Sequence, residues 1–202
     1  MRSAHAESSD EMLMVRYKRG DRDAFAELVR RYQRPLFNFS LRYVGAVDLA
    51  ADLTQETFLR VVKRSADFKH ESRFSTWLFA ITRNLCIDEL RRRKLRPVQN
   101  SELQEERIAP AEANATRSAS PLDAERNTAS SELRTCILRA IDCLPEEQKE
   151  VFLLRQLGGI PFVEIARIVD APENTVKSRM RYALERMQQE LSDFEEYARA
   201  LR

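Results

Sequence analysis

The sequence predicts an all-helical protein built from two small domains. Glycine and proline are scarce, at four and seven residues, and a third of the residues are charged. Leu, Ala, Glu and Arg, which favour helix over sheet, are abundant. Apolar residues recur at spacings of three and four through two separate blocks of the chain. Because 202 residues suit one large or two small domains, we expect one domain for each block.

The first block, residues 12–96, is expected to hold four helices. The pattern breaks at Gly20-Asp21 and again through the segment Ser65–Phe74. Apolar positions between these breaks follow the helical period. The predicted helices are Leu13–Arg19, Ala24–Tyr43, Asp48–Arg64 and Ser75–Arg93.

Residues 97–130 are predicted to form a flexible linker. This stretch is rich in Ala, Ser, Asn, Thr and Glu and holds three prolines. It has too few large apolar residues to bury a core of its own. We therefore expect it to tether the two domains.

The second block, residues 131–192, also predicts four helices. Pro145, the pair Gly158-Gly159 and Pro172 separate them. The predicted helices are Glu132–Leu144, Glu146–Leu157, Pro161–Val169 and Glu173–Leu191. The last two have the layout of a helix-turn-helix, in which Ile165, Ala166, Val169 and Val176 would fill the angle between them.

The second helix of this motif is a candidate for reading DNA. A recognition helix meets the major groove near its N-terminal end, where Arg can grip guanine and Lys, Ser and Thr can bind phosphates. An ordinary helical hairpin with a charged face is the alternative. The candidate residues are Glu173, Asn174, Thr175, Lys177, Ser178, Arg179 and Arg181.

The charges are placed unevenly, although the formal net charge is only +2. Residues 12–96 carry 19 Lys and Arg against 10 Asp and Glu, while residues 97–129 carry 3 against 6 and residues 130–202 carry 11 against 13. A basic N-terminal domain beside an acidic linker suits contact with nucleic acid at one end of the chain. A solvated basic surface is the alternative.

Several classes of protein are disfavoured by the sequence. No apolar run approaches the ~20 residues that span a bilayer, and the first residues do not resemble a signal peptide, so we expect a soluble, cytoplasmic protein without membrane insertion. Two histidines and no Gly-rich phosphate loop argue against an enzyme, and we expect no cofactor and no metal. Three cysteines without a CxxC pair suggest buried thiols. A metal sensor using Cys136, Cys143 and His70 stays open.

Three segments of the first block resemble region two of the extracytoplasmic-function (ECF, group IV) sigma factors of the sigma-70 family. These segments are 52–58, 68–84 and 88–94, and segments 144–148, 151–155 and 175–179 resemble the family's region four. The two regions occur in the family's order and at its usual separation. Two departures are Asp170, where the family's turn usually has glycine, and Ile160-Pro161, where a Ser cap is common. The resemblance implies a four-helix region-two domain and a helix-turn-helix region-four domain.

The resemblance also implies the function and the partners. An ECF sigma factor binds RNA polymerase core, through the clamp helices of the largest subunit and the flap, and directs initiation at promoter DNA. Members are typically held inactive by an anti-sigma protein. Asp52, Gln55 and Glu56, within one helical turn, match the residues that bind core polymerase. A solvated face in which Glu56 pairs with Arg60 is the alternative.

Contact with the minus-ten element is implied for the segment after the third helix. The residues expected to line a base-capturing loop are Phe68, Lys69, His70, Glu71, Ser72, Arg73 and Phe74. Trp77 and Asn84 match positions at the duplex junction, although a core role for Trp77 is the alternative. Arg83, Arg91 and Arg92 belong to a cationic helix that suits phosphates. The recognition helix would read the minus-thirty-five element. A helix-turn-helix regulator acting without polymerase is the rival interpretation, but it leaves residues 52–84 unexplained.

Overall fold

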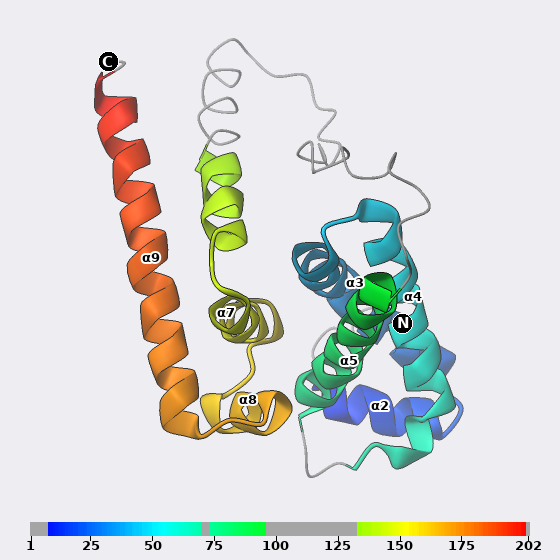
Figure 1. Ribbon diagram of the computed structural model, residues 1–202. Helices are drawn as coiled ribbons and strands as arrows, with labels where there is room; N and C mark the ends of the chain where they lie inside the picture. The colour runs from blue at the N-terminus through cyan, green and yellow to red at the C-terminus, as the bar shows by residue number, and fades with distance from the viewer. Residues whose placement is uncertain (1–7, 70–72, 96–132, 201–202) are drawn as a thin grey trace.

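The computed structural model describes residues 8–69, 73–95 and 133–200, with side chains up to residue 192. All regular secondary structure in these ranges is helical. The described helices form two groups, one on each side of residues 96–132 (Figure 1). The prediction of an all-helical, two-domain chain is therefore confirmed, while the predicted linker, residues 97–130, lies outside the described residues.

The described part of the N-terminal domain holds four α-helices and one 3-10 turn. Helix α3 is central and contacts the other three α-helices. Three phenylalanines and several leucines are buried at this junction, including Leu28, Phe39, Leu78 and Phe79. The elements are α2 (Asp10–Lys18), α3 (Arg22–Val44), α4 (Val47–Lys63), η1 (Ser65–Asp67) and α5 (Phe74–Leu95). All four predicted helices of this block are present.

The ends of α3 follow from local chemistry. Asp21 caps its start, because one carboxylate oxygen accepts hydrogen bonds from the backbone N–H groups of Asp23 and Ala24 at 3.1 and 3.2 Å. Gly45 ends the helix in the left-handed conformation at φ 74°, which glycine adopts without steric cost. The break predicted at Gly20-Asp21 is thus a capped helix start.

The C-terminal domain also has the four helices predicted for it. A helix covers residues 133–142 and is followed by α7 (Glu146–Gly158), α8 (Phe162–Val169) and α9 (Glu173–Ala200). Helix α7 contacts both α8 and α9. Helix α9 runs beyond the predicted end at Leu191 to Ala200, and the residues that follow Leu191 include the good helix formers Glu195, Glu196, Ala198 and Arg199.

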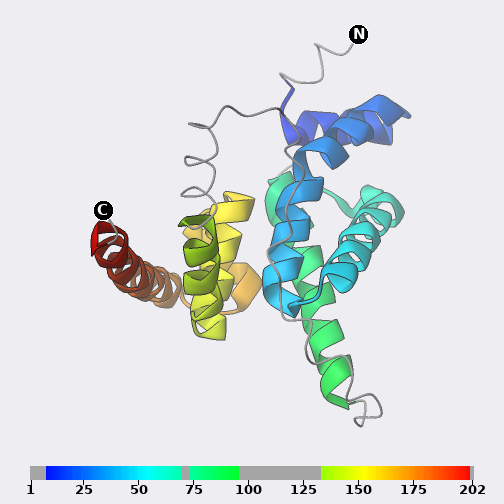
Figure 2. The ribbon, with the colours of Figure 1, turned by 90° about the horizontal axis from the view of Figure 1, so that it is seen from above.

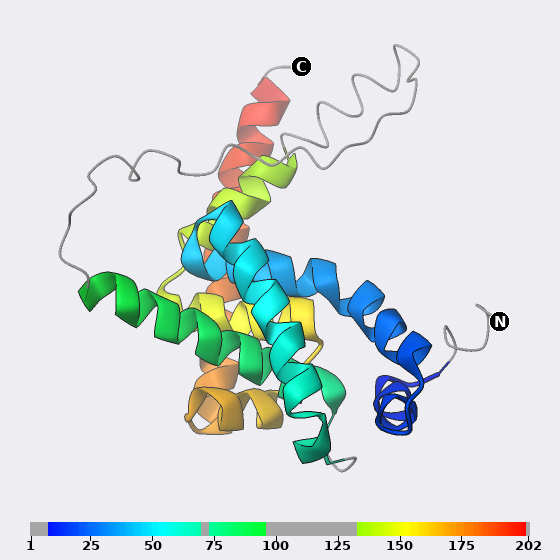
Figure 3. The same cartoon turned by 90° about the vertical axis from the view of Figure 1, so that its right-hand side faces the viewer.

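The two domains touch each other. Helix α7 packs against α3 and α5, and α8 contacts α5. Seen from above, α7 lies between α9 and the N-terminal helices (Figure 2), and a side view shows α8 beneath α5 (Figure 3). The sequence contains no signal from which this contact could be predicted.

Replacing Asp170 with glycine should stabilise the C-terminal domain. Asp170, in the turn between α8 and α9, has φ 52° and ψ 54°, and among the described residues no other non-glycine has a positive φ. Relief of this strain, less the extra chain entropy of glycine, should raise the free energy of unfolding by about 0.5–1 kcal/mol. Denaturant unfolding measures the change. Gly159→Ala, at φ 61°, should shift it in the opposite direction, and a destabilised Asp170→Gly would contradict the prediction.

Candidate polymerase and nucleic-acid interfaces

Helix α4 presents a polar face to solvent. Its inner face is buried through Leu53, Thr57 and Val61, whereas Asp52 and Gln55 are exposed. Glu56 pairs with Arg60 at 3.1 Å, and both side chains are 40% exposed. The pairing considered from the sequence therefore exists, but an exposed pair of this kind contributes only about 0.3–0.5 kcal/mol. Such a pair leaves the carboxylate of Glu56 available to a partner.

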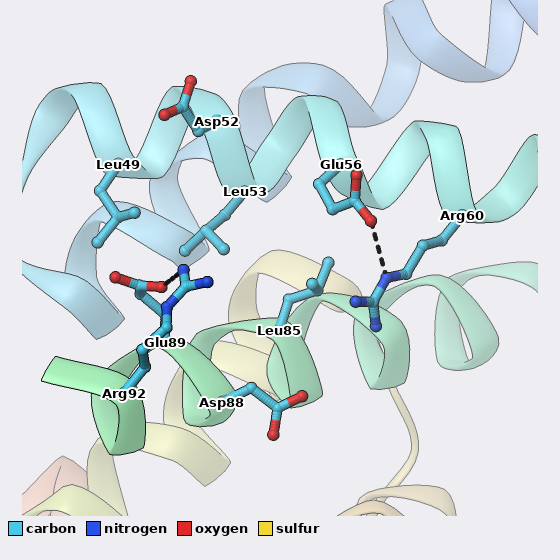
Figure 4. A pocket seen from close by; sticks show the side chains of 9 residues that line it. All are labelled: Leu49, Asp52, Leu53, Glu56, Arg60, Leu85, Asp88, Glu89 and Arg92. Atoms are coloured by element: carbon cyan, nitrogen blue, oxygen red, sulfur yellow. Dashed lines mark hydrogen bonds and ion pairs between the residues drawn. The ribbon is translucent and has the colours of Figure 1, made fainter. Parts of the chain in front are cut away.

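A hollow of about 380 Å³ lies beside this face, between α4 and α5. Figure 4 shows Leu49, Leu53 and Leu85 pointing into it. The Glu56–Arg60 pair borders one side and the Glu89–Arg92 pair the other. The hollow therefore has an apolar floor and a charged rim. Sequence reasoning missed it, because its leucines read as ordinary core positions of two separate helices.

One face of α5 carries polar and aromatic groups. Trp77 is partly exposed and Asn84 and Arg91 are exposed, and their spacing of seven residues puts them on one side of the helix. The Asp88 carboxylate makes no ion pair among the described residues. Glu89, three and four residues before Arg92 and Arg93, pairs with both of them.

The aromatic residues around the predicted base-capturing loop form a packed cluster. Phe68 and Phe74 are 4% and 0% exposed, and their rings meet edge to face at 5.8 Å. Trp77 contacts both rings. The phenylalanine side chains therefore pack together at the two ends of the loop in this arrangement, and the expectation that these two residues contact the minus-ten element stays a prediction.

Two of the other loop residues are basic and exposed. Lys69 and Arg73 are exposed at the two edges. His70, Glu71 and Ser72 lie outside the described residues. An exposed basic residue therefore stands next to each of the two phenylalanines in the chain.

The helix-turn-helix packs as the sequence predicts. Ile165 and Val176 are fully buried between α8 and α9, and Ala166 and Val169 pack against the same core. The first turns of α9 expose Asn174, Thr175, Lys177 and Ser178, with Arg181 exposed one turn further on and Glu173 and Arg179 half-buried.

Acidic residues of the same domain hold the cations of α9. Lys177 pairs with Glu173 at 2.7 Å, Arg179 with Glu147 at 2.6 Å and Arg181 with Glu185 at 3.5 Å. Each pair has at least one side chain more than half exposed. Such pairs are weak in water, so phosphate or a base edge can compete for these cations.

A buried acid joins the two domains. Glu150 of α7 is 8% exposed and accepts a hydrogen bond from the Tyr43 hydroxyl at 2.6 Å. Arg83 of α5 forms an ion pair with the same carboxylate oxygen. Burial, and then the adjacent Glu150, raise the pKa of the Tyr43 phenol. Arg83, expected at the DNA, is thus held by the C-terminal domain in this arrangement.

Polar contacts flank this buried acid. Arg42 pairs with Asp142 at 2.8 Å, and Thr76 hydrogen-bonds Glu164. Sequence reasoning missed Glu150 because a Glu within an amphipathic helix looks solvated until the opposing domain is placed.

Known protein families match the two domains separately. The model of sigma-70 region 2 matches residues 28–96, and the model of sigma-70 region 4 matches residues 134–187. The chain belongs to the extracytoplasmic-function sigma factors of the sigma-70 family. It is 34% identical over 181 residues to the ECF RNA polymerase sigma-E factor of Escherichia coli K12, covering 88% of this chain and 91% of the relative. The sigma-E factor of Haemophilus influenzae is 33% identical over 183 residues, covering 91% and 95%.

Solved structures share the fold. The complex of CnrH with the cytosolic domain of CnrY gives a TM-score of 0.61 at 20% identity, covering 92% of this chain and 99% of that one. The sigma factor RpoE of Bartonella quintana, solved with the anti-sigma factor NepR, gives 0.63 at 24% identity, covering 83% and 96%. The two-domain helical architecture is therefore one that sigma factors adopt.

As a sigma factor, the chain binds RNA polymerase core and directs it to promoter DNA. The rival interpretation, a regulator acting without polymerase, is not favoured, because the region-2 match accounts for the N-terminal block. No helix among the described residues is both long and apolar enough to cross a membrane. Across the same part of the chain, no group of three or more His, Cys, Asp or Glu is placed to hold a metal.

Proposed function

We propose that this sigma factor divides its work between residues 12–96, which bind core polymerase and the minus-ten element, and residues 131–192, which bind the minus-thirty-five element. Residues 97–130 connect the two. The observation that carries the proposal is that each matched domain presents its motif residues on an exposed helix face. Polymerase supplies the covalent chemistry, so the chain is not itself an enzyme and needs no cofactor.

Core polymerase docks on the acidic face of α4. Asp52 and Gln55 are exposed there, and Glu56 is restrained only by a weak pair. The adjoining hollow accepts an apolar side chain of the docked polymerase helix between its two charged rims. Apolar contact in the hollow adds affinity, and the carboxylates fix the register of docking.

Promoter DNA meets basic surfaces on both domains. Lys69, Arg73 and the exposed face of α5, with Trp77, Asn84 and Arg91, bind the minus-ten region. Arg92 and Arg83 join them once their acidic partners release them. Exposed α9 residues enter the major groove at the minus-thirty-five element. His70, Glu71 and Ser72, outside the described residues, remain in the proposed base-capturing segment.

An anti-sigma protein is the proposed regulator. The Bartonella quintana relative was solved in complex with such a factor, and the two domains of this chain can be held together or released as units. The site of action is the cytoplasm, where core polymerase and chromosomal DNA are found.

In vitro transcription with purified bacterial core polymerase tests the proposal. A fragmented genomic template is transcribed with and without the protein, and the 5′ ends are mapped. New start sites that share two upstream sequence elements are expected only when the protein is present. DNA binding without any core-dependent start would contradict the proposal.

A further inference from the structure

None of the binding residues named in the proposed function lies on helix α2. This helix precedes residue 28, where the match to sigma-70 region 2 begins. It nevertheless contacts both elements that border the predicted base-capturing segment, η1 before it and α5 after it. The residues of α2 that make these contacts therefore bear on how the segment is held.

Lys18 holds the side before the segment. Its ammonium donates hydrogen bonds to the carbonyl oxygens of Phe68, at 2.7 Å, and Ala66, at 3.3 Å. The same ammonium lies 5.9 Å from the centroid of the Phe68 ring. Three interactions from one side chain thus fix the backbone immediately before Lys69.

Glu11 holds the side after the segment. Its carboxylate accepts a hydrogen bond from the backbone N–H of Phe74 at 3.0 Å. Phe74 is the first residue of α5, so this N–H has no partner within the helix. A negative charge at a helix N-terminus is also favourable. Glu11 therefore fixes the backbone that follows Arg73.

Helix α2 is firmly attached to the rest of the domain. Leu13 and Met14 are fully buried. Asp10 accepts a hydrogen bond from the Tyr32 hydroxyl at 2.5 Å and pairs with Arg31 at 2.6 Å, and both of these partners lie on α3. The contacts made by Lys18 and Glu11 therefore originate from a fixed platform.

We propose that Lys18 and Glu11 are positioning residues for minus-ten recognition. By holding the carbonyl of Phe68 and the N–H of Phe74, they set the separation and direction at which Lys69 and Arg73 face DNA. A surface ordered in advance loses less conformational entropy on binding. The inference rests on the function proposed above, because it assigns a role within the same minus-ten site.

If Lys18 and Glu11 acted only through their charges, their variants would give different results from those expected of positioning residues. Loss of the Lys18 cation weakens DNA binding whether Lys18 acts through its charge or through positioning. The matched control is therefore Arg19→Met. It removes an exposed neighbouring cation that has no side-chain partner among the described residues. The Glu11→Ala variant distinguishes the electrostatic role from the positioning role. Removing a negative charge should strengthen DNA binding through electrostatics, whereas loss of positioning should weaken it. Glu11→Gln keeps an acceptor oxygen and Lys18→Arg keeps donors, so both variants should retain minus-ten recognition.

The test uses holoenzyme assembled from core polymerase and the full chain, on the promoter mapped for the wild-type protein. One template pool has a randomised minus-ten element and the other a randomised minus-thirty-five element. For Lys18→Met and Glu11→Ala we expect initiation to fall about 10-fold and base preference to flatten in the minus-ten pool alone. Glu11→Gln, Lys18→Arg and Arg19→Met should keep the wild-type preference.

Three results would overturn the inference. The first is an unchanged minus-ten preference in Lys18→Met and Glu11→Ala. The second is an equal loss in both pools with a lowered unfolding temperature, which would mean that these residues act only through stability. The third is the absence of any core-dependent start site with the wild-type protein. That result would contradict the proposed function itself, and it would be seen before any variant is compared.

Discussion

Core polymerase should bind the double variant Asp52→Ala with Glu56→Ala at least about 100-fold more weakly than the wild-type protein. Both side chains lie on the exposed face of α4, beside the hollow floored by leucines. Their loss removes the proposed acidic contacts without touching a buried residue, so the free energy of unfolding should change little.

The magnitude follows from what charged contacts contribute at an interface. Truncating one member of a desolvated, hydrogen-bonded charge pair costs about 2 kcal/mol or more, which is roughly 30-fold in affinity. Asp52 forms no ion pair with any of the described residues, whereas Glu56 must loosen a weak one. We therefore expect Asp52→Ala to have the larger single effect. The two sites are one turn apart, so their effects should not add fully.

Titration of fluorescently labelled core measures the affinity. The matched control is Glu185→Ala with Glu190→Ala, which removes two exposed carboxylates from α9 of the other domain. The control should bind core like the wild type. Equal losses in the test and control variants would mean that net charge, and not the α4 face, governs docking.

Much of the fold could be predicted from the sequence because its signals are local. The apolar period and the breaks at Gly20-Asp21, Pro145 and Gly158-Gly159 predicted all eight helices of the two domains. Asp170 was noted where the family's turn usually has glycine, and its φ of 52° is a conformation that glycine adopts without steric cost. These features depend on a residue and its near neighbours in the chain.

The features that the sequence did not reveal all depend on distant segments meeting. Phe68 and Phe74 looked like rings for bases, but Tyr32 and Trp77 pack around them. Glu150 looked solvated until the other domain covered it. Local periodicity carries no information about such partners.

The Glu150→Ala variant should separate the two domains. Reading both promoter elements requires separation, since elements near minus thirty-five and minus ten lie roughly 25 base pairs apart, about 85 Å along B-form DNA. Helix α8 of one domain contacts α5 of the other here. The described arrangement therefore cannot place both domains on their elements at once.

The Glu150 carboxylate is the charged centre of the contact that must break. Without it, the Arg83 guanidinium, whose side chain is 18% exposed, and the Tyr43 hydroxyl lose their partner. Leaving a buried charge unpaired costs several kcal/mol, and partial exposure of Arg83 reduces this to about 2–3 kcal/mol. The ratio of closed to open molecules should fall roughly 30- to 150-fold.

Spin-label distances between Ala51→Cys on α4 and Gln188→Cys on α9 measure the opening. Cys136 and Cys143 are replaced by serine, while Cys86 can stay because burial raises the pKa of its thiol to about 12 and hides it from the label. We expect one narrow distance distribution in the parent protein and a longer, broader distribution in Glu150→Ala. Tyr43→Phe, which removes one hydrogen bond from the other domain, should show a smaller shift in the same direction.

The matched control for Glu150→Ala is Glu147→Ala. Glu147 lies on the same helix, but it pairs with Arg179 of its own domain, so its loss should leave the parent distance distribution unchanged. An unchanged distribution in Glu150→Ala, with both domains still folded by circular dichroism, would show that the buried acid does not hold them together. If the prediction holds and Arg83 binds DNA as proposed above, the sigma factor must break this contact each time it engages a promoter, because one guanidinium cannot pair with Glu150 and with DNA at once. An anti-sigma protein that favours the closed arrangement would then need to supply only the few kcal/mol by which open and closed states differ.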